Sequence, residues 1–274
     1  MRFSSRSFRC GTRIFARLRI SLTSKLAPLL EGVDWVFHQA AQAGVRASWG
    51  EDFRIYSDNN VYATQRLLEA ARDSGVTKFI YASSSSVYGD TDDLPMRETS
   101  ATAPVSPYGV TKLAGEHLAR LYWVNYRVPV VSLRYFTVYG PRQRPDMAFH
   151  RFARAVLEDT EITLFGDGTQ SRDFTFVDDI VGANLAAAES DAAGAVFNIG
   201  GGSRTTVNEV IATIGEIVGR DPRVNRLEMQ KGDVKHTAAD TAAAQSALGY
   251  GPRVALREGL EREVAWVRGL LESS

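Results

Sequence analysis

The chain of 274 residues lacks several features that would assign it to a specialised class of protein. It has one cysteine, Cys10, so no disulfide can form within it, which favours a reducing compartment such as the cytoplasm. Its 32 basic and 32 acidic side chains cancel, so no overall attraction to nucleic acid is expected. No stretch approaches the roughly 18 apolar residues of a spanning helix, which predicts no membrane segment. With 44% hydrophobic residues, the remaining class is a globular protein with a sizeable core.

Acidic residues are absent from the first thirty positions, and the first one is Glu31. Seven basic residues occupy this stretch, namely Arg2, Arg6, Arg9, Arg13, Arg17, Arg19 and Lys25. An Arg- and Ser-rich start without acids resembles an organellar transit peptide. A disordered basic tail, or a segment that is not the native start of the fold, would have the same composition.

Short apolar runs alternate with helical patterns from about residue 26 onward. Strands are predicted at 33–38, 78–82, 129–135, 162–165 and 196–199, and helices at 60–72, 107–126, 178–189, 206–219 and 256–271. Strands separated by long helices indicate a parallel sheet and an α/β fold. Ligands of such sheets lie beyond the carboxyl ends of the strands, so the loops after His38, Ala82 and Tyr135 are the candidate site. Asp178 or Asp179 is expected to cap its helix.

The candidate chemistry lies in a tyrosine, a lysine and a run of serines. Tyr108 and Lys112 are four residues apart at the start of a predicted helix, so both face one side. A nearby ammonium favours the phenolate and lowers the pKa of a tyrosine, which can then act as a general base toward a sugar hydroxyl. The serines at 83–86 follow a predicted strand. Taken alone, Tyr108 and Lys112 could be an exposed pair on a helix, and the serines could be a polar loop that caps a helix. The two motifs together favour a reacting site.

Eight stretches, in order along residues 26–271, resemble the NAD-dependent sugar-nucleotide epimerases and dehydratases, which are extended short-chain dehydrogenases. They read HQAA (38–41), DNNV (58–61), SSSSVYG (83–89), SPYGVTK (106–112), LRYF (133–136), TVYGP (137–141), RDFTFVDD (172–179) and FNIG (197–200). The resemblance implies a Rossmann-like, doubly wound parallel sheet with a smaller α/β substrate-binding domain toward the C-terminus.

The resemblance also implies a role for individual residues. Tyr108 would be the base, Lys112 its electrostatic partner, and Ser84 a hydrogen-bonding partner of the reacting hydroxyl. The residues implied to bind NAD are Gln39, Ala40, Ala41, Asn59, Ser83, Tyr108, Lys112 and Phe136. Those implied to bind substrate are Ser85, Ser86, Thr137, Arg144, Thr163, Leu164, Phe165, Arg172, Gln230 and Asp233. Arg172 suits a diphosphate, although a salt bridge with Asp173 or Asp178 is an equal alternative without the resemblance. No metal site is expected.

The implied reaction is epimerisation at C4 of a nucleotide sugar through a transient 4-keto sugar. Dehydratases of the family need an acidic pair where this chain has Ser85 and Ser86, so an epimerase is favoured. Residues 137–147 and 229–234 are similar to those of UDP-glucuronate 4-epimerases. UDP-glucuronate is therefore favoured over UDP-glucose and UDP-GlcNAc, with its carboxylate held by Thr137, Arg144 and the serine loop. A homodimer through helices near 60–73 and 108–125 is implied as well.

A glycine-rich phosphate turn, with which the family begins, is absent before His38. The resemblance therefore predicts an N-terminally truncated Rossmann domain with exposed strand edges. Its expected divisions are a non-homologous segment 1–25, an NAD-binding part 26–136 plus about 173–200, and a substrate-binding part 137–172 plus 201–274. Two hypotheses stay open beside the epimerase: an inactive member that binds a nucleotide or a partner or is an inert fragment, and a dehydrogenase that releases NADH.

Overall fold

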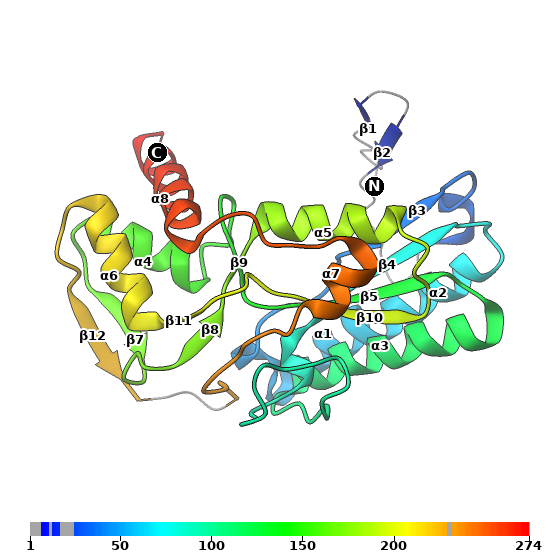
Figure 1. The fold of residues 1–274 in the computed structure, drawn as a ribbon, viewed down its shortest axis with the longest axis horizontal. Coiled ribbons are helices and arrows are strands. Elements are labelled where there is room, and N and C mark those ends of the chain that lie inside the picture. The colour runs from blue at the N-terminus through cyan, green and yellow to red at the C-terminus, as the bar shows by residue number, and fades with distance from the viewer. Residues whose placement is uncertain (1–6, 11–12, 17–24, 229–231, 274) are drawn as a thin grey trace.

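Parallel strands form the central sheet of the computed structural model, which describes residues 7–10, 13–16, 25–228 and 232–273 (Figure 1). The strand order is β10–β5–β4–β3. The bounds are β3 Trp35–His38, β4 Lys78–Ser84, β5 Val130–Tyr135 and β10 Ala195–Ile199. All three neighbouring pairs are parallel, which confirms the predicted α/β fold. Each strand lies within two residues of its predicted position.

Helices cover both faces of this sheet. One face carries α2 (Ala63–Arg72) and α3 (Pro107–Tyr126), and the other carries α5 (Val177–Glu189) and α7 (Ala242–Leu248). Alternate side chains of β4 serve the two faces: Phe79 and Tyr81 pack with α2 and α3, while Ile80 packs with α5. The predicted helix at 60–72 begins earlier, with α1 (Phe53–Tyr56) and a π-helical segment, Ser57–Tyr62, ahead of α2.

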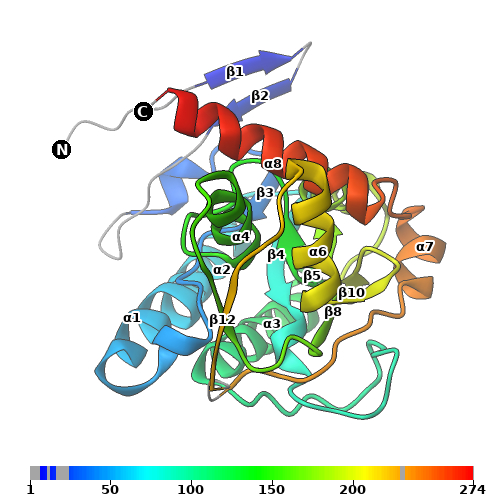
Figure 2. The same ribbon diagram turned by 90° about the vertical axis from the view of Figure 1, so that its left-hand side faces the viewer.

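A smaller lobe packs beside the sheet, seen on the left of Figure 1 and facing the viewer in Figure 2. Its helices are α4 (Ala148–Leu157), α6 (Val207–Val218) and α8 (Leu256–Glu272). Its short strands are β6 Val138–Tyr139, β7 Ile162–Phe165, β8 Ser171–Asp173, β9 Thr175–Phe176, β11 Arg204–Thr206 and β12 Val224–Leu227. They pair as β12–β7, β11–β8 and β6–β9. The three helices share one apolar core, distinct from the cores on the sheet. The domain boundaries stay a prediction.

The two described segments nearest the N-terminus form an antiparallel pair of their own, β1 (Ser7–Cys10) and β2 (Arg13–Ala16). Strand β3 lies at one edge of the central sheet, and no described strand pairs with its outer side. In the described part of the chain, no helix is long and apolar enough to cross a membrane.

The expected aspartate cap of α5 is wrong. Phe176 occupies the capping position, and no side chain bonds the helix start. The Asp179 carboxylate instead accepts hydrogen bonds from the backbone N–H groups of Arg253 and Val254. It therefore anchors the segment before α8, a distant contact that local sequence could not indicate.

Candidate active site

The start of α3 lies directly against the serine turn that follows β4. Ser106 caps the helix, because its side chain accepts a hydrogen bond from the Gly109 N–H, and Pro107 fills the first helical position. A Cβ atom at Gly109 would lie 2.6 Å from the carbonyl oxygen of Ser86. Only glycine allows this approach, which brings the first turn of the helix to the carboxyl end of the strand.

That approach brings Tyr108 and Ser84 together. The Ser84 side chain lies close enough to the Tyr108 phenol to lower its pKa. Ser84 is the last residue of β4, and its Oγ accepts from the Ser86 N–H at 3.2 Å, so the turn holds its side chain in place. The Tyr56 ring lies edge-on to Tyr108, with 6.3 Å between the ring centroids. The two motifs singled out in the sequence therefore form one group.

The pKa of Tyr108 is raised rather than lowered. Burial of the phenol is the largest cause, and it outweighs the hydrogen bond with Ser84 and the charge of Arg144, which both lower the pKa. The expected lowering by Lys112 is wrong for these residues. The Lys112 ammonium lies 6.0 Å from the Tyr108 ring centroid and donates to the carbonyl oxygen of Ala82 at 2.7 Å.

Lys112 lies under the reacting group and is 4% exposed. Burial lowers its pKa to about 8, and the charge of Glu116 acts in the opposite direction. Its Nζ also lies 5.4 Å from the ring centroid of Tyr81. The side chain is thus a cation at neutral pH that is close to losing its proton.

The residues after β3 contribute at the same edge of the sheet. Gln39 Nε2 donates to Asn184 Oδ1 at 2.9 Å, and the Tyr135 hydroxyl donates to Gln39 Oε1 at 3.0 Å. Ala40 and Ala41 follow in this loop with exposed or half-exposed side chains. These three predicted cofactor residues therefore lie at the carboxyl ends of the strands, where a ligand is expected.

Three other predicted cofactor residues are not brought to this group. Asn59 donates to the carbonyl oxygen of Ile55 on the helix surface, and Phe136 is 0% exposed in an apolar cluster. Ser83 is next to Ser84, but its hydroxyl donates to Glu116 and not to the reacting group. The neighbouring Asn60, which sequence reasoning missed, is buried instead. Its Oδ1 accepts from the Gln42 N–H at 2.7 Å, and its Nδ2 donates to Thr111 Oγ1 on α3 at 3.0 Å. It ties the loop after β3 to α3.

Arg144 lies near the reacting group, as expected for a substrate contact. Its charge lowers the pKa of both Tyr108 and Tyr56. The guanidinium donates to both carboxylate oxygens of Asp146, at 3.0 and 2.9 Å. Thr137, two residues after β5, is half-buried. Arg144 thus binds the Asp146 carboxylate in a two-pronged geometry.

Arg172 forms neither of the two salt bridges that were open alternatives. Its guanidinium donates to the carbonyl oxygens of Ser171 at 2.9 Å, Lys235 at 3.0 Å and Val234 at 2.5 Å. Burial is the largest cause that lowers its pKa. Asp178 pairs with Arg262 instead. Arg172 therefore anchors the segment around residue 234.

Arg46 is a residue of this region that sequence reasoning missed. It donates to Asp233 Oδ2 at 2.7 Å, and its guanidinium carbon lies 4.4 Å from the ring centroid of Phe165. Thr163 is half-buried on the same strand, β7, whereas Leu164 faces the core of the smaller lobe. Its position in the loop after β3, one of the loops predicted to form the site, could have identified Arg46 as a candidate. The predicted Gln230 lies outside the described residues.

Comparison with known proteins gives a consistent assignment. A family model described as "NAD dependent epimerase/dehydratase family" matches residues 2–200. The match begins inside the segment 1–25, so the assignment of that segment as non-homologous stays a prediction. A UDP-glucose epimerase of Bacillus subtilis (strain 168), YtcB, named as uncharacterized, is 45% identical over 252 residues, which cover 92% of this chain and 79% of the relative.

Two further relatives carry more specific names. The UDP-glucuronate 4-epimerase of Thermodesulfobacterium geofontis is 39% identical over 238 residues, covering 86% of this chain and 73% of the relative. The crystal structure of UDP-glucuronic acid 4-epimerase from Bacillus cereus, in complex with UDP-glucuronic acid and NAD, has a TM-score of 0.90 and 46% identity. That match covers 92% of this chain and 81% of the other.

Proposed function

The chain belongs to the NAD-dependent epimerase/dehydratase family, and we propose that it epimerises a UDP-sugar at C4, with UDP-glucuronate as the favoured substrate. One observation carries the proposal: the Tyr108 phenol lies beside Ser84 at the carboxyl end of the central sheet, with Lys112 one helical turn further along α3. This is the expected location of a reacting group in a parallel sheet. Relatives named as UDP-glucuronate 4-epimerases agree with it.

The residues divide the chemistry between them. Tyr108 takes the proton from the 4-hydroxyl of the sugar, and Ser84 orients that hydroxyl by a hydrogen bond. Because the pKa of Tyr108 is raised by burial, its phenolate needs a neighbouring cation. The charge of Arg144 lowers this pKa, and the Lys112 ammonium lies 6.0 Å from the ring centroid. NAD, when bound, would supply the oxidant that accepts a hydride from C4 and returns it to the opposite face of the 4-keto sugar. Tyr108 then returns the proton to the 4-oxygen, so that C4 is inverted with no net oxidation.

The described residues fit the reacting end of NAD. Buried Lys112 offers donors beside Tyr108, and the loop of Gln39, Ala40 and Ala41 lies at the same edge of the sheet. Ahead of β3, the described residues offer no helix whose start could bind the pyrophosphate, only the short turn Ala27–Leu29. NAD binding by this chain is therefore the first point to measure.

For the substrate, we assign the sugar carboxylate to Arg144 and the diphosphate to Arg172 and Arg46. Arg144 already binds a carboxylate, that of Asp146, in the two-pronged geometry that a uronate would use. Arg172 and Arg46 both contact the segment 233–235, next to Phe165 of β7. Guanidinium groups suit phosphate oxygens for the same geometric reason.

We also propose a homodimer through the outer faces of α2 and α3. Large apolar side chains are exposed on α3 and just before α2: Val110, Leu121, Val124 and Tyr126 lie on α3, and Tyr62 directly precedes α2. Leu121→Glu is expected to convert a dimer to a monomer in light scattering coupled to gel filtration. Val181→Glu, on the opposite helix layer and equally exposed, is the matched control and should leave the mass unchanged. Equal masses for both variants would contradict the assignment. A cytoplasmic location rests on composition and stays a prediction.

The proposed function is tested by calorimetric titration of the full chain with NAD, followed by chromatography of UDP-glucuronate incubated with chain and NAD. Saturable binding and formation of the C4 epimer are expected. A cooperatively folded chain that binds no NAD and forms no epimer would favour the inactive family member. Accumulation of NADH in proportion to substrate would favour the dehydrogenase.

A further inference from the structure

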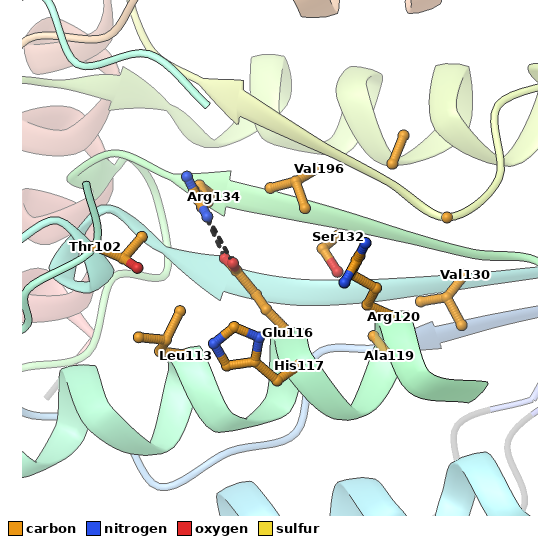
Figure 3. A pocket seen from close by; sticks show the side chains of 12 residues that line it. Thr102, Leu113, Glu116, His117, Ala119, Arg120, Val130, Ser132, Arg134 and Val196 are labelled. Atoms are coloured by element: carbon orange, nitrogen blue, oxygen red, sulfur yellow. Dashed lines mark hydrogen bonds and ion pairs between the residues drawn. The ribbon is translucent and has the colours of Figure 1, made fainter. Parts of the chain in front are cut away.

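A buried ion pair lies beneath the reacting group. Glu116 on α3 accepts from Arg134 of β5 twice, Oε1 from Nε at 2.9 Å and Oε2 from a terminal nitrogen at 2.7 Å. Figure 3 shows the two side chains reaching toward each other from helix and strand. They are 5% and 6% exposed and form part of the wall of a cavity of about 140 Å³, with exposed His117 and Arg120 also lining it. Neither Tyr108 nor Lys112 lines that cavity.

The pair is the centre of a larger network that joins three strands. Ser83 Oγ donates to Glu116 Oε1 at 2.5 Å, and Ser83 directly precedes Ser84. Arg134 donates to the Tyr88 hydroxyl at 2.8 Å, which donates in turn to Asn198 of β10 at 2.6 Å. The network therefore fixes the carboxyl ends of β4, β5 and β10 relative to α3.

Glu116 also lies on the same side of α3 as the reacting residues. It follows Lys112 by one turn and Tyr108 by two, so the three side chains are neighbours along the helix. The helix lies very close to β4 at this point, because a Cβ atom at Gly115 would lie 2.0 Å from the Tyr81 hydroxyl. A change at Glu116 therefore acts on Lys112 and on the strand ends together.

Stability alone does not account for this pair. Burying two charges costs hydration free energy, and their mutual attraction rarely exceeds that cost. Apolar residues of similar volume would hold α3 on β5 equally well. A carboxylate does what no apolar side chain can: it accepts from Ser83 and Arg134 at once and puts a negative charge one turn from Lys112.

We propose that Glu116 is a positioning residue of the epimerisation site, which holds the Ser83–Ser84 strand end against α3 and keeps Lys112 in its cationic form. The proposal rests on the proposed function for the role of Tyr108 and Lys112. Glu116 touches neither substrate nor cofactor and acts through its neighbours.

The charges around Lys112 agree with this role. Burial lowers the pKa of Lys112 to about 8, and Glu116 is the charge that raises it again. The other titratable groups that face the ammonium are Tyr81 and Tyr108, both with a raised pKa, and His38, whose pKa is lowered to about 4. All three are neutral at pH 7, so Glu116 is the anion among them.

The test is a pH titration of the lysine side chains in the full chain, followed by NMR with ¹³C-labelled lysine. The chain has five lysines, and the Lys112 signal is identified by its loss in Lys112→Arg. The wild-type signal is expected to titrate near pH 8. In Glu116→Gln it should titrate lower by at least about half a unit, because the stabilising opposite charge is gone. Glu158→Gln, which breaks an exposed pair with Arg154 on α4, is the control and should change nothing.

A second variant guards against misfolding. Glu116→Gln leaves Arg134 buried without its partner charge, whereas Glu116→Gln/Arg134→Gln removes both charges and should fold. A lowered Lys112 titration in folded Glu116→Gln supports the proposal, and an unchanged one overturns it. If only the double variant folds, it is compared with Arg134→Gln, which differs from it in the Glu116 charge alone, and the same two outcomes decide. The readout needs no turnover, so a chain that shows the shift without epimerising UDP-glucuronate fails the proposed function and not this role. In an active chain, the alkaline limb of kcat should move to lower pH with the titration, and an unmoved limb would contradict the proposal.

Discussion

Two ion pairs hold different sides of the candidate site. Glu116–Arg134 is buried beneath the reacting group, with side chains 5% and 6% exposed. Arg46–Asp233 lies over β7 of the smaller lobe, with side chains 46% and 24% exposed. Arg46 stacks on Phe165 and is within reach of solvent, whereas the buried pair has its hydrogen bonds satisfied by protein groups.

The difference in burial between the two ion pairs matches two different requirements of the site. The reacting group has to keep its geometry, and a buried, fully bonded network is rigid. The nucleotide side has to exchange protein contacts for substrate contacts, and exposed pairs contribute little and break easily. Losses at the buried pair should therefore appear in folding and kcat, and losses at the exposed pair in KM.

The largest effect is expected where the reacting group itself is changed. Tyr108→Phe removes the proton acceptor and should lower kcat by about 10²–10⁴-fold, the usual contribution of a general base. Tyr56→Phe, whose ring contacts that of Tyr108, is the control for the loss of a neighbouring hydroxyl. Steady-state kinetics and calorimetry with UDP measure both effects. Full activity in Tyr108→Phe would remove Tyr108 from the mechanism.

Breaking the buried pair should cost more stability than breaking any other ion pair described here. Arg134→Met leaves the Glu116 carboxylate without its partner and should lower the free energy of unfolding by about 3–5 kcal/mol. The double variant Glu116→Leu/Arg134→Met should recover most of this loss, since no charge stays buried. Urea unfolding followed by circular dichroism compares the two. Equal losses in both variants would show that the pair matters for its packing and not for its charges.

Glu263 in the smaller lobe is a second buried carboxyl group. Comparing it with Glu116 tests what hydrogen bonds contribute to a buried carboxylate. Glu263 is 0% exposed, neither of its carboxyl oxygens has a hydrogen-bond partner in the described part of the chain, and burial raises its pKa to about 7. Folding favours the protonated form, so its contribution to stability is present below about pH 4.5 and is lost as the pH rises to 7.

Replacing this group should remove that pH dependence. Glu263→Gln is expected to raise the free energy of unfolding at pH 8 by roughly 1–3 kcal/mol and to change little at pH 4.5. Glu261→Gln, on the exposed side of the same helix, is the control. Urea unfolding curves at the two pH values measure these changes. Equal changes in the free energy of unfolding at both pH values would rule out titration of Glu263 as the cause.

The smallest effect is expected at the exposed pair. Arg46→Ala should change stability by less than about 1 kcal/mol but raise KM for the UDP-sugar by roughly five-fold, the equivalent of one exposed charge contact. Arg154→Ala, which breaks an exposed pair on α4, should leave KM alone. A lowered kcat in Arg46→Ala with an unchanged KM would reverse the proposed division of the site.

The sequence predicted helices and strands correctly where the local pattern of apolar residues and of start signals was clear. The helix over Pro107–Tyr126 was predicted with its observed bounds, because Pro107 marks its start. Helix α4 was missed although Phe149, Phe152, Ala153 and Val156 face one core with helical spacing. Helix α7 is short and alanine-rich, so its sequence has little periodicity to read.

The part of the site that consists of short sequence motifs was predictable. Tyr108, Lys112 and Ser84 lie together because neighbouring strands end at one edge of the sheet. The contact between Arg46 and Asp233 joins residues 187 positions apart, and the pair of Glu116 and Arg134 depends on strand register, so neither could be read from spacing. The raised pKa of Tyr108 depends on burial, which a sequence does not give.

Proton NMR of UDP-glucuronate incubated in D₂O with the full chain and NAD tests the proposed epimerisation most directly. Conversion to the C4 epimer without solvent deuterium at C4 is expected, because the hydrogen removed from that carbon returns to it. Conversion with deuterium at C4, or no conversion by a folded chain that binds NAD, would contradict it.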